Sequence, residues 1–183
     1  IEIFVIFKAI INQDLMKAFI TMMLISVFVV TSAAQESCSN FQAAVSPDGN
    51  TLYFSSNRSG SYYIYRANAD GSDVQRVSSN DFEEWAPQVS PDGSKIAFVS
   101  SSADGKGDIW TMSPEGGGVE RLTERPDAYD YFPAWSPDGK WIVFASGTDH
   151  YPTEGVWELV LVKPGTKTVV PLFKSGARDV FPD

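Results

Sequence analysis

Few side chains of this sequence are of the types that perform catalysis or bind soft metals. Of its 183 residues, one is His and one is Cys, which excludes His/Cys zinc sites and an intrachain disulfide. His150 lies in a polar segment beside Asp149 and Tyr151, where an imidazole could serve as a general base. We interpret it instead as an ordinary exposed side chain, and Cys38 as a free thiol.

Two acidic clusters offer oxygen ligands for a hard cation. Asp81, Glu83 and Glu84 form one, and Asp127 and Asp130 form the other. Their spacing is not that of a calcium-binding loop, so we interpret them as solvated surface charge and expect no metal site. The sequence also lacks a Gly-x-Ser-x-Gly elbow, a His-Glu-x-x-His motif and a phosphate-binding glycine loop. We therefore predict that these residues are not an enzyme and hold no cofactor.

Charge and composition narrow the class of protein further. The chain carries 14 Lys+Arg against 23 Asp+Glu, a formal net charge of -9, so it offers no basic surface to phosphates and nucleic-acid binding is excluded. Hydrophobic residues make up 43% of the chain and aromatic residues 13%, which is enough to build a packed core.

The first forty residues differ from the rest. Met16-Lys17 precedes an apolar run over 18–30 and small residues over 31–34, the order of a secretory signal peptide at 16–34. The run is shorter than the roughly 20 apolar residues of a transmembrane helix, so we expect no membrane span in the mature chain. Residues 1–15 are interpreted as an upstream or misannotated segment, and 35–40 as a linker. Lipidation of Cys38 is the weaker alternative, because the residues before it are polar.

From Phe41 onward the sequence repeats itself. Ser-Pro-Asp-Gly occurs at 46–49, 90–93 and 136–139, a period typical of propellers and solenoids. Proline, aspartate and glycine in this order favour a tight hairpin turn, so we assign the motif a structural role and no chemistry. Alternating apolar residues follow each copy and are expected to be buried between blades: Leu52, Phe54, Ile96, Phe98, Ile142 and Phe144.

Each repeat contains four short strand patterns, here called A to D, and no helical period. A single four-stranded sheet cannot bury both faces, whereas sheets arranged around an axis can. The sequence therefore predicts an all-β partial β-propeller at 41–183. It has three four-stranded antiparallel blades, at about 41–80, 81–125 and 126–174, and the start of a fourth.

The repeats resemble a known family. Ser-Pro-Asp-Gly, a strand ending in Phe-x-Ser, an Ile-Tyr or Ile-Trp pair and a turn before Val-x-Arg are similar to the WD40-like PD40 repeat of TolB-like propellers, most closely at 46–78 and 90–123. The resemblance implies a periplasmic or secreted protein that binds a partner protein at the bacterial cell envelope. Similar repeats also precede the catalytic domain of prolyl-oligopeptidase-like hydrolases, so an N-terminal propeller of such an enzyme is the alternative.

Strand direction predicts where binding residues gather. In a four-stranded blade the A–B and C–D turns share one end, and the B–C loops and inter-blade connections share the other. We call the latter the variable end, because its segments differ between repeats. Loops on a rigid scaffold commonly carry binding residues, and Trp and Tyr are common hot spots. The predicted binding residues there are Asn57, Arg58, Glu83, Glu84, Trp85, Asp104, Tyr129, Asp130 and Tyr131. Trp85 and Tyr131 are also expected to pack between blades.

Overall fold

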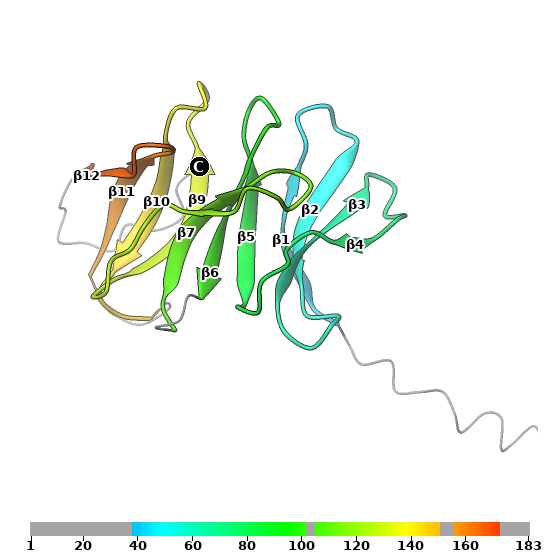
Figure 1. Cartoon of the computed structure of the whole chain (residues 1–183), viewed down its shortest axis with the longest axis horizontal. Helices are drawn as coiled ribbons and strands as arrows, with labels where there is room; N and C mark the ends of the chain where they lie inside the picture. Colours follow the sequence, from blue (N-terminus) through cyan, green and yellow to red (C-terminus); the bar gives the residue numbers. More distant parts are fainter. Residues whose placement is uncertain (1–37, 102–104, 151–155, 173–183) are drawn as a thin grey trace, which may run out of the picture. The chain divides into compact units, whose positions relative to one another are not determined.

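Twelve strands form three antiparallel sheets in the computed structural model, which describes residues 38–101, 105–150 and 156–172 (Figure 1). The first sheet contains β1 (Asn40–Val45), β2 (Thr51–Ser56), β3 (Tyr63–Asn68) and β4 (Gln75–Arg76). The second contains β5 (Glu84–Val89), β6 (Ile96–Ser101), β7 (Gly107–Met112) and β8 (Glu120–Arg121). The third contains β9 (Tyr129–Trp135), β10 (Ile142–Gly147), β11 (Trp157–Lys163) and β12 (Thr168–Pro171).

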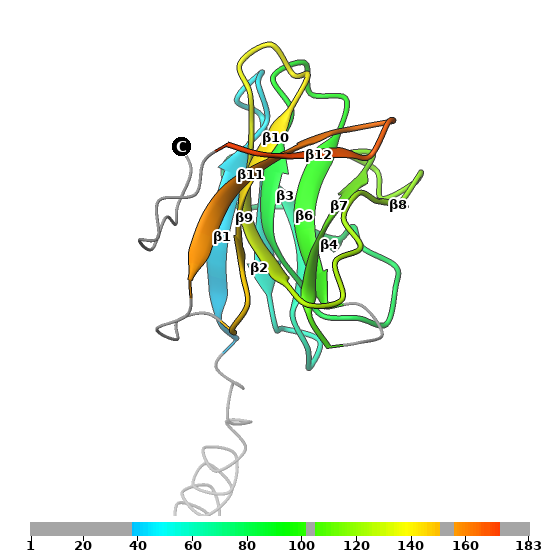
Figure 2. The ribbon, with the colours of Figure 1, turned by 90° about the vertical axis from the view of Figure 1, so that its left-hand side faces the viewer.

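The strands of each sheet are paired in the order in which they occur along the chain. Each sheet is therefore one up-and-down blade, and the predicted all-β partial propeller of three four-stranded blades is confirmed. Figure 2 looks along the row of sheets, with the third sheet nearest the viewer. The predicted start of a fourth blade, the signal peptide at 16–34 and the segment 1–15 lie outside the described residues. Within those residues, no helix is long and apolar enough to cross a membrane.

The Ser-Pro-Asp-Gly motif closes the turn between the first two strands of every blade. In the first copy the Ser46 hydroxyl donates to Asp48 Oδ1 at 2.5 Å, and Asp48 Oδ1 accepts the Asn50 N–H at 3.1 Å. The Thr51 N–H donates to Ser46 Oγ at 2.9 Å. Gly49 has φ of +75°, which a residue with a Cβ rarely adopts. The motif thus has the structural role that the sequence predicts.

The same three hydrogen bonds recur in the other two copies. Two of the three, from the Ser hydroxyl and from the N–H two residues after the Asp, are accepted by the carboxylate and favour its charged form, so they lower the pKa of Asp92 and Asp138 to about 2. The Ser hydroxyl is the largest cause in each case.

The first strand of every blade also contains a β-bulge. The register shifts after Phe41 in β1 and after Trp85 in β5, and β9 is irregular at the same position. The bulged residues Gln42, Ala86 and Phe132 have φ of 52°, 54° and 56°. A non-glycine residue in this left-handed region is uncommon, and its presence at the same position in three blades marks it as part of the repeat.

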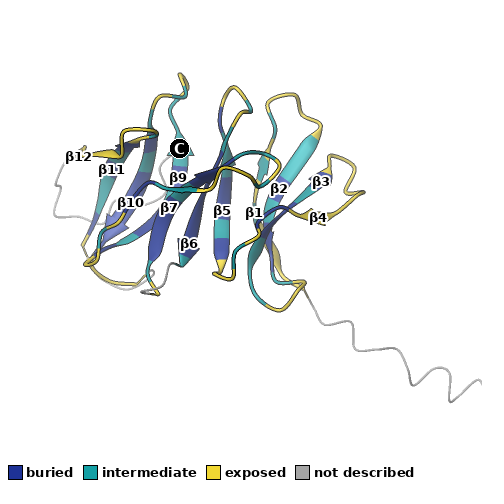
Figure 3. Cartoon of the chain, in the orientation of Figure 1, coloured by how far each residue is buried: buried dark blue, intermediate teal, exposed yellow. Residues whose placement is uncertain are grey.

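Burial differs between the blades because only some faces are covered by a neighbouring sheet (Figure 3). Ile96, Phe98, Ile142 and Phe144 are fully buried, as predicted. Leu52 and Phe54 are only half-buried, which corrects the expectation for the first blade. Their face of the first sheet meets no other sheet among the described residues, and it borders a groove of about 350 Å³.

Candidate functional site

Backbone hydrogen bonds place the connections and B–C loops together at the variable end. Asn57, which follows β2, donates its N–H to the Ser39 carbonyl at 3.3 Å and accepts the Ser39 N–H on Oδ1 at 2.7 Å. One blade further on, the Ser101 N–H donates to the Glu83 carbonyl at 2.9 Å. At the opposite end, the Ala69 N–H donates to the Asn50 carbonyl and joins the two turns of the first blade. The predicted separation of the two ends is therefore correct.

Arg58 is fixed on the first blade. Its Nε donates to Ser56 Oγ at 3.0 Å, and its Nη2 donates to Asn40 Oδ1 at 3.0 Å. The guanidinium carbon lies 4.8 Å from the centre of the Tyr65 ring and 5.2 Å from that of Phe54. Arg58 is nevertheless exposed, so it presents a positive charge whose orientation is fixed before any partner binds.

An aromatic cluster joins the second and third blades at the variable end; it consists of Trp85, Tyr129, Tyr131, His150 and Trp157. Tyr131 is its centre, with ring centroids 5.9 Å from Trp85 and 5.7 Å from Trp157. Tyr129 lies 6.2 Å from Tyr131 and 5.5 Å from His150. Burial raises the pKa of Tyr131 to about 12. Tyr131 and Trp157 are therefore packing residues, whereas Trp85 and Tyr129 are half-buried and can contact a partner.

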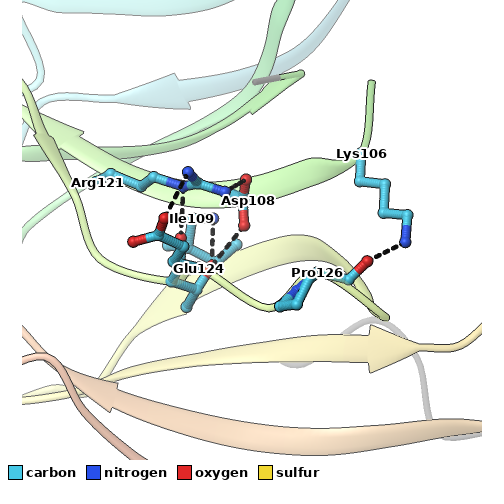
Figure 4. A network of polar contacts seen from close by, with 7 residues as sticks. Lys106, Asp108, Ile109, Arg121, Glu124 and Pro126 are labelled. Atoms are coloured by element: carbon cyan, nitrogen blue, oxygen red, sulfur yellow. Dashed lines mark hydrogen bonds and ion pairs between the residues drawn. The ribbon is translucent and has the colours of Figure 1, made fainter. Parts of the chain in front are cut away.

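Sequence reasoning missed the ring contacts of His150 and missed Lys106 altogether. His150, interpreted as an ordinary exposed residue, is exposed but packs edge-on against Tyr129 and Tyr131. Lys106 lies with Nζ 5.6 Å from the Tyr129 ring centre and donates a hydrogen bond to the Pro126 carbonyl (Figure 4). Neither pairing has a signal in the repeat pattern, since both residues lie outside the repeated strands.

A polar network holds the connection that leads into the third blade (Figure 4). Arg121 pairs with Asp108 at 2.7 Å and with Glu124 at 3.6 Å. Thr123 Oγ1 accepts the Ile109 N–H at 3.0 Å. The segment 124–128 is thereby anchored to the second blade, and it borders a pocket of about 510 Å³ at the variable end.

Glu84 and Asp130 do not lie on the surface as predicted. Both residues are 0% exposed, because each lies at the start of the first strand of a blade, Glu84 as the first residue of β5 and Asp130 as the second of β9, and its side chain is directed toward the preceding blade. Burial raises the pKa of Glu84 to about 7 and also raises that of Asp130. These two residues are therefore internal, and their expected place on an exposed binding surface is corrected.

Glu83 is exposed, and so is its neighbour Phe82, at 40%. Phe82 is a further residue that sequence reasoning missed. Asp104 lies outside the described residues. We use the name variable surface for the accessible side chains that remain: Asn57, Arg58, Phe82, Glu83, Trp85 and Tyr129.

The sequence profile of the PD40 family, described as the TolB beta propeller domain, matches residues 12–153. The chain belongs to this family. An uncharacterized protein of Agrobacterium fabrum is 38% identical to this TolB-like propeller over 109 residues, 51% of this chain and 35% of that protein. The Tol-Pal system protein TolB of Nitratidesulfovibrio vulgaris is 31% identical over 86 residues, 44% of this chain and 19% of that protein.

A solved structure supports the same assignment. The protein assigned as TolB from Agrobacterium tumefaciens matches this TolB-like propeller with a TM-score of 0.67 and 30% identity, over 74% of this chain and 49% of that one. The chain thus spans half or less of the length of these relatives. Among the residues that the structure describes, no group of three or more His, Cys, Asp or Glu side chains is arranged to hold a metal ion.

Proposed function

We propose that this TolB-like propeller acts in the periplasm or outside the cell, where it binds a partner protein of the bacterial envelope through the variable surface. Membership of the PD40 family supports the proposal, and so does the similarity to a protein that is named for the Tol-Pal system. The observation that carries it is the contrast between the two ends of the blades. One end repeats the same hydrogen-bonded turn three times, and the other presents different aromatic and charged side chains.

The variable surface has the features of a preorganised binding site. Arg58 is oriented by two hydrogen bonds and two rings, and Trp85 is held against Tyr131. Side chains that are already ordered lose little conformational entropy when a partner binds. Large aromatic residues at the centre of an interface commonly contribute most of the binding free energy. The geometry therefore supports recognition of a protein surface.

The partner would be isolated with the full-length protein from an envelope extract and identified by mass spectrometry, and its affinity measured by calorimetry. We expect Trp85→Ala and Phe82→Ala each to lower the affinity by about 30-fold, equivalent to about 2 kcal/mol. Lys140→Ala is the matched control, because this exposed residue follows a Ser-Pro-Asp-Gly turn; it should leave the affinity unchanged. Thermal melting of each variant separates lost contacts from lost folding.

Two results would count against the proposal. Unchanged affinity in both aromatic variants would place the binding site elsewhere on the protein. Hydrolysis of prolyl peptides by the full-length protein, with no envelope partner recovered, would favour the hydrolase alternative.

A further inference from the structure

The two blade junctions are built from equivalent residues. We call the contact between the first and second blades the first junction, and that between the second and third blades the second junction. Glu84 lies directly opposite Ser100 in the first, and Asp130 lies directly opposite Ser146 in the second. Each acid therefore lies within the first two residues of the first strand of a blade and is paired with a serine of the second strand.

The preceding blade contributes a hydroxyl to each junction. Ser78 Oγ accepts the Ile64 N–H at 3.1 Å, and Thr123 Oγ1 accepts the Ile109 N–H at 3.0 Å. These two residues therefore occupy the same position in consecutive repeats. Two residues further along the chain come Asn80 in the first junction and Arg125 in the second, which makes these the fourth equivalent pair.

In the second junction a cation accompanies the buried acid. Arg125 Nη1 donates to Ser146 Oγ at 2.6 Å, and the Ser146 hydroxyl donates to Asp130 Oδ1 at 2.5 Å. Arg125 Nη1 lies 3.7 Å from Asp130 Oδ1. An ionised Asp130 can therefore remain inside the packed junction, because a positive charge lies next to it.

The first junction has the acid without that cation, because Asn80 takes the place of the arginine. Both carboxylate oxygens of Glu84, Oδ1 of Asn80 and Oγ of Ser100 are buried, and none makes a hydrogen bond of good geometry with the described residues. The Ser78 hydroxyl and the Asn80 amide nevertheless lie near enough to favour the charged form of Glu84. Burial, which favours the neutral form, has the larger effect on the pKa of Glu84.

The groups around Glu84 come from four parts of the chain besides its own strand. Ser78 and Asn80 belong to the connection after β4, Ser100 belongs to β6, and the Tyr62 carbonyl before β3 accepts the Glu84 N–H at 2.8 Å. Arg76 of β4 is the one charged side chain found to act on Glu84 within the described part of the chain.

The guanidinium of Arg76 is committed to other partners. Its Nε donates to the Ser78 carbonyl and its Nη2 to the Asn80 carbonyl, each at 2.7 Å, and the group lies 3.4 Å from the centre of the Tyr63 ring. It makes no ion pair with Glu84. Arg76 therefore acts on Glu84 only through its longer-range electrostatic effect, without direct contact.

We propose that Glu84 is a proton switch in the first junction, which packs tightly while the carboxyl group is neutral and loosens when it ionises. A buried carboxylate without a contacting cation is costly, so loosening lets water reach it. The second junction, with Arg125 beside its acid, changes less. Trp85 follows Glu84 directly on β5, and the switch would therefore regulate the variable surface; this last step rests on the proposed function.

The direction of the pH dependence of packing, and the pH range over which it acts, follow from the raised pKa of Glu84. This pKa is about 7 in the folded chain, against 4.5 for an ordinary Glu. The packed junction binds the proton more tightly than the open one. Its stability is therefore complete below pH 4.5 and is lost as the pH rises toward 7. The equilibrium constant for packing should fall by about tenfold per pH unit over that range and change little above it. Acidic conditions tighten the junction.

The test is amide hydrogen exchange of the full-length protein at pH 5 and pH 8, corrected for the intrinsic dependence of exchange on pH. We expect protection at 62–64 and 84–86 to be tens of times lower at pH 8, with a smaller change at 129–132. Glu84→Gln should remove the difference, because glutamine keeps the shape without the charge. Asn80→Arg should also remove it, since it supplies the cation of the second junction.

The reciprocal variant is Arg125→Asn, which should give the second junction the pH dependence of the first. Equal protection of the first junction at both pH values would overturn the proposal, as would a difference that persists in Glu84→Gln. These measurements need no partner, so their outcome does not depend on whether the proposed function is correct. Partner affinity that is lower at pH 8 in the wild type, and pH-independent in Glu84→Gln, supports the regulatory step; equal affinities overturn that step alone.

Discussion

Gly107 of β7 should not tolerate a methyl group, because the central ring of the aromatic cluster lies against its backbone. A Cβ added there would overlap Cε1 of Tyr131 and would lie 2.7 Å from its Cδ1 and 3.0 Å from Val99 Cγ1. Ordinary contacts between carbon atoms are about 3.5–4.0 Å. Either β7, which carries Gly107, or β9, which carries Tyr131, must therefore move by about 1 Å.

The Tyr131 ring has little room to yield. It is 5% exposed and lies between Trp85 and Trp157. Overpacking of this kind costs about 1–3 kcal/mol, so we expect Gly107→Ala to lower the free energy of unfolding by about 2–3 kcal/mol, at the upper end of that range. The measurement is equilibrium denaturation of the full-length protein in urea, with tryptophan fluorescence as the signal.

Gly117→Ala is the matched control, because its Cβ would meet only Ser113 Oγ at 3.5 Å and should change the stability by less than about 0.5 kcal/mol. A second test uses the background Tyr131→Leu, in which the Gly107→Ala cost should shrink because the ring is gone. If Gly107→Ala were as stable as Gly117→Ala, the packing described for the cluster would be wrong.

Three further predictions concern stability. Glu84→Gln should raise the free energy of unfolding by about 3 kcal/mol at pH 8, because the pKa of the carboxyl group differs by about 2.5 units between the folded and unfolded chain, at about 1.4 kcal/mol per unit. The gain should vanish near pH 4, and chemical denaturation at both pH values measures it. Asp92→Asn should flatten the acid limb of the stability profile, because the lowered pKa of Asp92 adds stability that is lost as the pH falls from 3.8 through about 2; an unchanged limb would contradict the hydrogen bonding of the turn. Lys167→Gly should raise the melting temperature, by relief of about 1 kcal/mol of strain at a φ of 53°, and a fall would show that the Lys167 side chain stabilises its turn.

The blades could be predicted from the sequence because the same turn occurs three times, and each copy is followed at the same spacing by alternating apolar residues. The separation of the two ends follows from strand direction alone. The half-buried state of Leu52 and Phe54 could not be read from their alternation, because it depends on whether a neighbouring sheet covers that face.

The candidate site was predicted less well. An acid next to an aromatic residue in a connection has the pattern of a surface loop, yet Glu84 and Asp130 are buried at the blade junctions. The bulges at Ala86 and Phe132 disturb the period of two from which a strand face is inferred. The contact of Arg125 with Asp130 depends on three-dimensional packing, and no spacing in the sequence distinguishes it from ordinary surface charge.

Contact between a partner protein and the variable surface can be tested directly by a hydrogen-exchange footprint of the full-length protein with and without its bound partner. We expect new protection at 57–58, 82–85 and 129–131, with no change at the Ser-Pro-Asp-Gly turns over 46–49, 90–93 and 136–139. Protection confined to those turns, with none at the variable surface, would contradict this expectation.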